Sequence, residues 1–258
     1  MEIKNSIGLP KTLWSKVIHN LERIISFYDL GNRFLSLFQD WKIRNKAIDF
    51  LFSGNNMYSV LDLGGGPGNL EPLLHKKAKY IVYVDTSSLM TMYAKRVHKK
   101  LRKVNYVRAV FEYLPFRNGI IDVGIASYSF RDSFNLVKAL QEAAKVLKKR
   151  LVIADIGKPD GRLQAKLVGL YFKIFVPLIT ALVTGWVKGN PWKLLYTTYV
   201  YLPSNSTYKM LLGKIFGKAF VVSFLMGAAV ILIGEKRLHA SLRTASFKRK
   251  NEISLVKS

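Results

Sequence analysis

An acidic residue followed by glycines on alternate positions is the pattern in this chain with the clearest chemical meaning. The pattern consists of Asp62, Gly64, Gly66 and Gly68. It lacks the Gly-Lys-Ser/Thr ending of a phosphate loop, and Asn69 stands where a dinucleotide fingerprint needs its third glycine. A carboxylate before the turn would repel a pyrophosphate and attract an ammonium group, so the pattern favours a ligand that resembles an amino acid.

A second acid, Asp85, ends the next apolar run along the chain. At the end of a second strand, a carboxylate is placed to accept charge-assisted hydrogen bonds from two ribose hydroxyls. S-adenosylmethionine carries both features, an amino acid at one end and an unmodified ribose in the middle. The two acids together predict this compound as the cofactor.

The elements that position these acids alternate between strands and helices. Strand-like apolar runs occupy residues 58–63, 80–84, 104–107, 120–126 and 151–156, and helical stretches occupy 87–102 and 133–147. This alternation predicts an α/β fold with a doubly wound, Rossmann-like and mostly parallel sheet covered by helices on both faces. Two further runs, 219–224 and 228–234, lie close enough to pair as a C-terminal antiparallel hairpin.

The remaining segments divide the chain into three parts. Residues 1–52 show apolar residues at helical spacing and predict an N-terminal helical cap, residues 53–236 form the α/β domain, and residues 237–258 form a basic tail. A helical insertion at about 160–203 is predicted to add to the cap. Its apolar run 174–187, like the run 219–234, is shorter than the ~18 residues of a membrane span, and Pro177 is expected to interrupt it.

Composition narrows the classes of partner and site. The 258 residues include no cysteine, which excludes disulfides, thiolate metal sites and cysteine nucleophiles, and no histidine cluster has metal-ligand spacing, so no metal is expected. A net charge of +25 attracts polyanions, either nucleic acid or an anionic membrane surface. The chain opens without a secretory signal, which favours a cytoplasmic protein, peripheral at the inner face of the cell membrane if its basic, apolar insertion lies in a bilayer surface.

Further motifs lie before and after the glycine turn in the sequence. They are Tyr28-Asp29 with Ser36 and Trp41, Glu112-Tyr113-Leu114-Pro115-Phe116, Ser127 to Asp132, Lys158-Pro159, and Tyr199 to Leu202. In this order the motifs resemble the ubiquinone/menaquinone biosynthesis C-methyltransferases, a family of class I S-adenosylmethionine-dependent methyltransferases. The resemblance covers residues 27–236 and implies methyl transfer to a lipid-soluble quinol-like small molecule.

The resemblance also implies the residues that hold the cofactor. They are Asp62, Gly64, Gly66, Pro67 and Gly68 around the methionine part, Asp85 at the ribose, Val110 and Phe111 at the adenine, and Ser127 near the sulfonium. Several positions depart from the family pattern, and they include Phe111, where the family has Ala. Val110 stands where the family has Asp or Asn, which leaves the adenine amino group without that acceptor, and Asp132 stands where the family has Asn.

Methylation of a ring carbon needs an ionised neighbouring hydroxyl rather than a protein nucleophile. Arg131 is the catalytic candidate, because it follows the fourth strand and its cation would stabilise a phenolate while a water or a carboxylate takes the proton. The alternative is a structural Arg131 paired with Asp132 or Asp155. His19, on a helix that covers the site, is the second acid-base candidate.

Two other functions remain open from the sequence. The basic charge by itself favours a nucleic-acid methyltransferase, although the chain has neither Asn-Pro-Pro-Tyr nor a catalytic cysteine. A non-catalytic binding protein that retains the methyltransferase fold is compatible with the unusual Val110.

Overall fold

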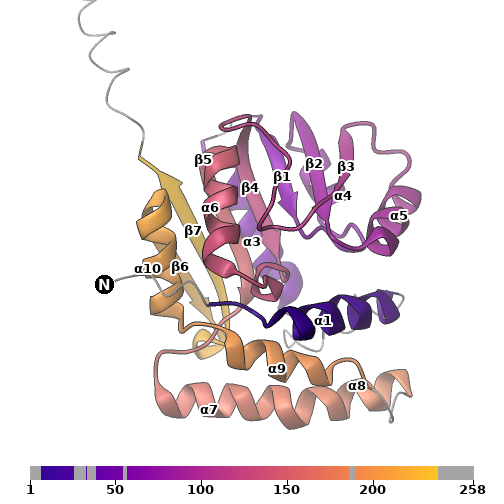
Figure 1. The fold of residues 1–258 in the computed structure, drawn as a ribbon, viewed down its shortest axis with the longest axis vertical. Coiled ribbons are helices and arrows are strands. Elements are labelled where there is room, and N and C mark those ends of the chain that lie inside the picture. Colours follow the sequence, from indigo (N-terminus) through magenta and orange to yellow (C-terminus); the bar gives the residue numbers. More distant parts are fainter. Residues whose placement is uncertain (1–6, 26–32, 34–38, 55–56, 186–189, 238–258) are drawn as a thin grey trace, which may run out of the picture.

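A seven-stranded sheet forms the centre of the protein. The computed structural model describes residues 7–25, 33, 39–54, 57–185 and 190–237 (Figure 1). The strand order is β3-β2-β1-β4-β5-β7-β6. The strands are β1 Ser59–Leu63, β2 Tyr80–Asp85, β3 Val104–Arg108, β4 Ile121–Ser127, β5 Leu147–Ile156, β6 Gly217–Phe224 and β7 Ala229–Lys236. β1 to β5 pair in parallel, and β7 pairs antiparallel with both β5 and β6, so the predicted fold class and the predicted hairpin are confirmed.

Helices cover both faces of the sheet, which explains why its central strands are almost continuously apolar. α6 (Leu136–Val146) and α10 (Asn205–Phe216) pack on one face, and α3 (Asp40–Leu51) and α4 (Glu71–His75) pack on the other. α5 (Ser88–Val97) contacts β2 and β3. In Figure 1, α6 and α10 lie in front of the strands and α3 lies behind them.

The two N-terminal helices have different environments. The α3 side chains of Ile43, Ala47 and Leu51 are fully buried in the same core as the strands. α1 (Lys11–Arg23) instead lies across the carboxyl ends of the parallel strands (Figure 1). The predicted cap therefore includes one helix that packs on the sheet, and the predicted boundaries stay predictions. The predicted tail lies outside the described residues from position 238 onward.

The helical insertion forms the outer layers at the carboxyl ends of the strands. It consists of α7 (Arg162–Leu170), a π-helical turn η3 (Tyr171–Phe175), α8 (Val176–Thr184) and α9 (Lys193–Tyr201). In Figure 1, α1, α9 and the α7–α8 pair lie in successive layers below the sheet. An apolar cluster that includes Phe172, Trp192 and Tyr199 joins the insertion to Tyr128, which follows β4.

The prediction that Pro177 interrupts the insertion is wrong. Residues Arg162–Leu182 form one helical run of 21 residues that is long and apolar enough to cross a membrane by length and composition, and 22% of its apolar window is buried. The π turn ends at Phe175, two residues before Pro177. Proline lacks a backbone N–H and its ring crowds the preceding turn of a helix. The wider π turn changes the hydrogen-bond pattern of that preceding turn, and the helix therefore continues through Pro177.

Candidate functional site

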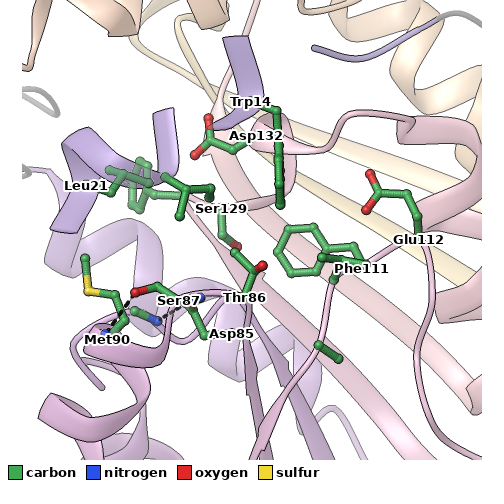
Figure 2. Close-up of a pocket in the computed structure, with 16 residues that line it drawn as sticks. Trp14, Leu21, Asp85, Thr86, Ser87, Met90, Phe111, Glu112, Ser129 and Asp132 are labelled. Carbon is green, nitrogen blue, oxygen red and sulfur yellow. Dashed lines mark hydrogen bonds between the residues drawn. The ribbon is translucent and has the colours of Figure 1, made fainter. Parts of the chain in front are cut away.

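A cavity with about 590 Å³ of empty space, part of it open to solvent, lies at the carboxyl ends of β1, β2 and β4, the edge at which parallel α/β sheets bind ligands. Figure 2 shows the residues around it. They come from the glycine turn (Gly64, Gly66), from the segments after β2 (Asp85, Thr86, Ser87, Met90) and β3 (Ala109, Val110, Phe111, Glu112), from the segment after β4 (Tyr128, Ser129, Asp132), and from α1 (Trp14, Ile18, Leu21).

The glycine turn places backbone rather than side chains against this cavity. Gly64 has φ +73°, and a Cβ atom there would lie 2.4 Å from the Cβ of Ser129. Gly66 has φ +56°, and its N–H donates to Asp85 Oδ2 at 2.9 Å. Gly68 does not line the cavity, because a Cβ on it would face the ring of His98 instead. Two of the three alternate glycines therefore form the cavity wall.

Asp85 lies at the end of β2, and the residue is 9% exposed. Backbone N–H groups hold its carboxylate in place. Its Oδ2 accepts from Gly66 and its Oδ1 accepts from the N–H of Ser87 at 2.8 Å. Burial raises the pKa of Asp85 to about 6, although these backbone N–H groups act in the opposite direction. Each carboxylate oxygen has a second lone pair, so Asp85 retains the capacity to accept two hydroxyl groups.

Asp62 is fully buried beneath the glycine turn and does not line the cavity. Its Oδ2 lies 3.0 Å from the position of a Cβ on Gly65, and its nearest acidic neighbour is the buried Glu71. Burial is the main cause that raises the pKa of Asp62 to about 7, and burial together with Asp62 raises that of Glu71. Their four carboxyl oxygens accept no hydrogen bond from a described residue, and two neighbouring buried carboxyl groups do not both ionise readily, which favours the protonated form of one of them.

Pro67 and Ser127 likewise lie outside the set of residues that line the cavity. The predicted cofactor contacts of Asp62, Pro67, Gly68 and Ser127 therefore stay predictions. The hydroxyl of Ser127 is buried at the end of β4 and has no hydrogen-bond partner among the described residues.

The segment after β3 supplies an aromatic wall. Phe111 lines the cavity and stacks on Phe130, with ring centroids 5.1 Å apart and an interplanar angle of 19°. Val110 lines the same wall. Glu112 adds a buried carboxylate, whose Oε1 accepts from the N–H of Asn135 at 2.9 Å. Glu112 follows Val110 by two residues in the sequence, and this spacing is the signal that could have placed Glu112 in the same wall.

The α1 helix covers the cavity with one face. Trp14, Ile18 and Leu21 line the cavity at helical spacing, while His19 is exposed and lines none of the cavities described here. The cover is attached by Ser87, whose hydroxyl donates to Glu22 Oε1 at 2.6 Å and accepts from the first turn of α5. Sequence periodicity indicated this helix, but it did not indicate which face meets the cavity.

A second cavity, with about 480 Å³ of empty space that is partly open to solvent, adjoins the first. Its walls are mostly apolar and come from α1, from α9 and from the short 3₁₀ turn η2 (Phe130–Asp132). The described residues that line it are Val17, Asn20, Leu21, Ile24, Arg131, Asp132, Pro191, Trp192, Leu194, Leu195 and Thr198. Leu21 and Asp132 line both cavities, so the two spaces meet beside these side chains.

Arg131 lies in this second wall within a buried group of charges. Its Nη1 lies 2.6 Å from Asp155 Oδ1, and its backbone N–H donates to Asp155 Oδ2 at 3.2 Å. Its Nε lies 3.6 Å from Asp132 Oδ1. The structural pairing considered from the sequence is therefore present with both acids. The catalytic role of Arg131 stays a prediction.

Several sequence motifs fall elsewhere. Tyr28, Asp29 and Ser36 lie outside the described residues. Trp41 is an exposed residue of α3, away from both cavities. Trp192, by contrast, is buried in the second cavity wall, and the helical spacing of the apolar insertion did not distinguish it from ordinary core residues.

The chain is similar to known methyltransferases. Residues 11–236 match the model of the ubiE/COQ5 methyltransferase family. The demethylmenaquinone methyltransferase of Thermotoga maritima is 30% identical over 220 residues, which are 83% of this chain and 93% of the relative. The ubiquinone/menaquinone biosynthesis C-methyltransferase UbiE of Wigglesworthia glossinidia brevipalpis is 28% identical over 186 residues, 69% of this chain and 74% of the relative.

Solved structures share the fold at lower sequence identity. The crystal structure of a SAM-dependent methyltransferase from Thermotoga maritima, described as a possible histamine N-methyltransferase, superimposes with a TM-score of 0.60 and 18% identity. The superposition covers 86% of this chain and 100% of that one.

Proposed function

Because the chain belongs to the ubiE/COQ5 methyltransferase family, we propose that it methylates a ring carbon of a lipid-soluble quinol in membrane quinone biosynthesis, with S-adenosylmethionine as the methyl donor. The observation that carries the proposal is the pair of adjoining cavities. One has the backbone turn and carboxylate that suit an amino-acid nucleoside, and the other is apolar with an arginine and an aspartate at the junction.

The larger cavity fits the cofactor in two respects. The carboxylate of Asp85 lines the cavity beside the glycine turn and can accept the two ribose hydroxyls, and Gly64 and Gly66 line the same cavity, where the methionine part would lie. Val110 and Phe111 supply an apolar wall for adenine. When bound, S-adenosylmethionine supplies a methyl group on a sulfonium. The proposed roles of Asp62, Pro67 and Gly68 are to shape the turn, and that of Ser127 is to lie near the sulfonium.

The second cavity suits an aromatic acceptor with an apolar tail. Leu, Ile, Val and Trp side chains form most of its wall and would exclude water from the reacting ring. Arg131 is held in one position by Asp155, and its guanidinium would stabilise the negative charge of an ionised hydroxyl. The α1 helix lines both cavities and α9 lines the second, so they would hold the donor and the acceptor in adjoining spaces.

The α7–α8 helix supports a peripheral position at an anionic membrane surface, where such an acceptor dissolves. Its large apolar residues recur every three or four positions and are 46% to 78% exposed: Leu163, Leu167, Leu170, Ile174, Leu178 and Leu182. Exposed Arg162, Lys166 and Lys173 lie on the same helical run. An apolar stripe flanked by basic side chains is typical of helices that lie in the headgroup region of a bilayer.

Methyl transfer to two competing acceptors tests the proposal. Purified protein is incubated with S-adenosylmethionine labelled in its methyl group, together with extracted demethylated quinol in lipid vesicles and with bulk RNA. We expect label in the quinol alone. Label in RNA alone would establish a nucleic-acid methyltransferase. Absence of label, together with absence of S-adenosylhomocysteine binding in calorimetry, would instead indicate a binding protein that retains the fold.

A further inference from the structure

The wall of the first cavity carries acidic side chains and, among the described residues, no basic one. Figure 2 shows the carboxyl groups of Asp85, Glu112 and Asp132 around it, and none of the described residues that line it is a lysine, an arginine or a histidine. The methionine part of S-adenosylmethionine carries a carboxylate as well as an ammonium group. A carboxylate enclosed without a cation is costly, so the cofactor needs a positive group close behind this wall.

Arg44 is a buried cation behind the wall. It lies one turn into α3 and is 6% exposed. Its Cζ lies 5.5 Å from the centre of the ring of Tyr128, and Tyr128 lines the cavity. Burial raises the pKa of Asp62 beneath the glycine turn, and the charge of Arg44 offsets a part of that rise. The guanidinium is therefore close both to the turn and to the residue that follows β4.

The donors of Arg44 are not used within the described part of the protein. Its Nε has no hydrogen-bond partner there, and none of the ion pairs found among the described residues includes Arg44. The hydroxyl of Tyr128 is also buried without such a partner, and burial raises its pKa, so it stays protonated as a donor. Buried donors are normally satisfied, and two neighbouring donors that lack an acceptor suit a bound anion.

The backbone of Tyr128 is strained at this place. Its φ is +58°, in the left-handed region that a bulky residue rarely adopts. Such strain persists only where the surrounding structure imposes it, and it is concentrated at sites that bind ligands. Here the strained residue carries the ring that contacts Arg44 and lines the cavity.

We infer that Arg44 binds the carboxylate of the methionine part of S-adenosylmethionine, and that the ring of Tyr128 holds the guanidinium in position. The inference rests on the proposed function, because it assumes that this cofactor occupies the first cavity. A guanidinium suits the role, because it is permanently charged and its paired N–H groups match the two oxygens of a carboxylate.

Other cations at this end of the sheet are engaged with the protein. Arg131 lies 2.6 Å from Asp155 and lines the second cavity but not the first. The Nζ of Lys158 donates to two backbone carbonyl groups at the end of α9, at 3.0 Å each. The Nε of Arg108 donates to the carbonyl group of Thr86 at 2.9 Å. Arg44 differs from these three, because its charge is buried while its Nε has no acceptor among the described residues.

The rival role for Arg44 is structural. Asp62 and Glu71 form a buried acidic pair beneath the turn, and Arg44 would then act only as their counter-ion. In that case its removal would disturb the turn and weaken every ligand of the cavity alike. A contact with the cofactor carboxylate instead predicts a loss that depends on the presence of that carboxylate.

Two ligands that differ in this one group separate the roles. Isothermal titration compares S-adenosylhomocysteine with its decarboxylated analogue, in which hydrogen replaces the carboxylate. We expect wild-type protein to bind the analogue about 10- to 100-fold more weakly, the usual contribution of hydrogen bonds between charged groups. Arg44→Gln should bind S-adenosylhomocysteine more weakly by a similar factor and bind the analogue as wild type does. Arg44→Lys should show an intermediate loss, because it keeps the charge without the paired N–H groups.

A matched control and a second measurement accompany the titrations. Arg96 is exposed, and its Cζ lies 5.6 Å from the centre of the Tyr93 ring, so Arg96→Gln removes a similar contact elsewhere and should bind both ligands as wild type does. NMR of wild-type protein with isotope-labelled arginine observes the site without a loss of charge. The Nε–H signal that is absent from Arg44→Lys should shift with S-adenosylhomocysteine and stay in place with the analogue.

The outcomes distinguish the inference from the proposed function. If wild-type protein binds the two ligands equally tightly, or if Arg44→Gln weakens both by the same factor, Arg44 does not bind the carboxylate, although the cofactor site stands. If Arg44→Gln unfolds, the NMR signal decides, and a signal that S-adenosylhomocysteine leaves unmoved overturns the inference. If wild-type protein binds neither ligand, the proposed function and the inference both fail.

Discussion

The guanidinium of Arg131 lies 2.6 Å from the carboxylate of Asp155, and both side chains are buried. The pair joins the η2 turn to the end of β5 and fixes the wall between the two cavities. Removal of one member of a buried pair leaves an uncompensated charge, which costs more than the pair itself contributes.

We therefore expect Asp155→Ala to lower the free energy of unfolding by about 3–5 kcal/mol. For a chain of this size the melting temperature should fall by roughly 6–20 °C, measured by calorimetry or circular dichroism. The matched control is Asp49→Ala, because Asp49 forms an exposed pair with Lys77 and such pairs contribute about 1 kcal/mol at most. Equal effects of the two substitutions would contradict the buried pairing.

The glycine turn gives a prediction with a control at a similar backbone angle. Gly64→Ala should reduce stability by a few kcal/mol and abolish S-adenosylhomocysteine binding, because φ is +73° and the new Cβ would overlap Ser129. Gly119→Ala has a similar φ of +59° with nothing within 4 Å, so it should cost only about 1 kcal/mol. Retained binding in Gly64→Ala would show that the turn does not contact the cofactor.

The carboxylate of Asp85 is expected to carry a large part of cofactor affinity. Asp85→Ala removes two charge-assisted hydrogen bonds of about 1.5–3 kcal/mol each, which corresponds to a loss of roughly 100-fold or more. Isothermal titration with S-adenosylhomocysteine measures this change, and Asp49→Ala again serves as the control. A dissociation constant within threefold of wild type, roughly the experimental scatter, would exclude a contact of Asp85 with the ribose.

Membrane binding should depend on the exposed stripe of α7–α8. The double substitution Leu167→Asp and Leu178→Asp should reduce flotation with anionic vesicles by about tenfold or more, because each leucine loses about 1.5–3 kcal/mol of apolar burial. Leu89→Asp, at a residue of α5 that is 53% exposed, is the matched control and should float as wild type does. Unchanged flotation of the double variant would assign membrane binding to another surface.

The buried acids beneath the turn should make stability depend on pH. Because the folded-state pKa of Asp62 is raised to about 7, the folded protein binds this proton more tightly than the unfolded chain does. The free energy of unfolding should therefore increase as the pH falls from about 8 to about 5. Asp62→Asn should show a smaller increase when the cofactor-free proteins are melted across this range. Parallel pH profiles for the two proteins would mean that Asp62 does not titrate in this range.

Local patterns predicted much of the fold because they reflect short-range physics. The short apolar runs predicted the strands, including the C-terminal hairpin of β6 and β7, to within a few residues. The course of the insertion was not predictable in the same way. Pro177 normally ends a helix, but the π turn before it is a local adjustment that packing against α9 stabilises.

The sequence by itself determined the methyltransferase class and the positions of Gly64, Gly66 and Asp85, because a strand end, a turn and an acid are defined by neighbours along the chain. Only the tertiary structure decided that Asp62 lies beneath the turn and that Asp132 lies between two cavities. The walls of those cavities come from α1, η2 and α9, which are far apart in the sequence. Their contacts depend on packing across the sheet edge, which no local spacing encodes.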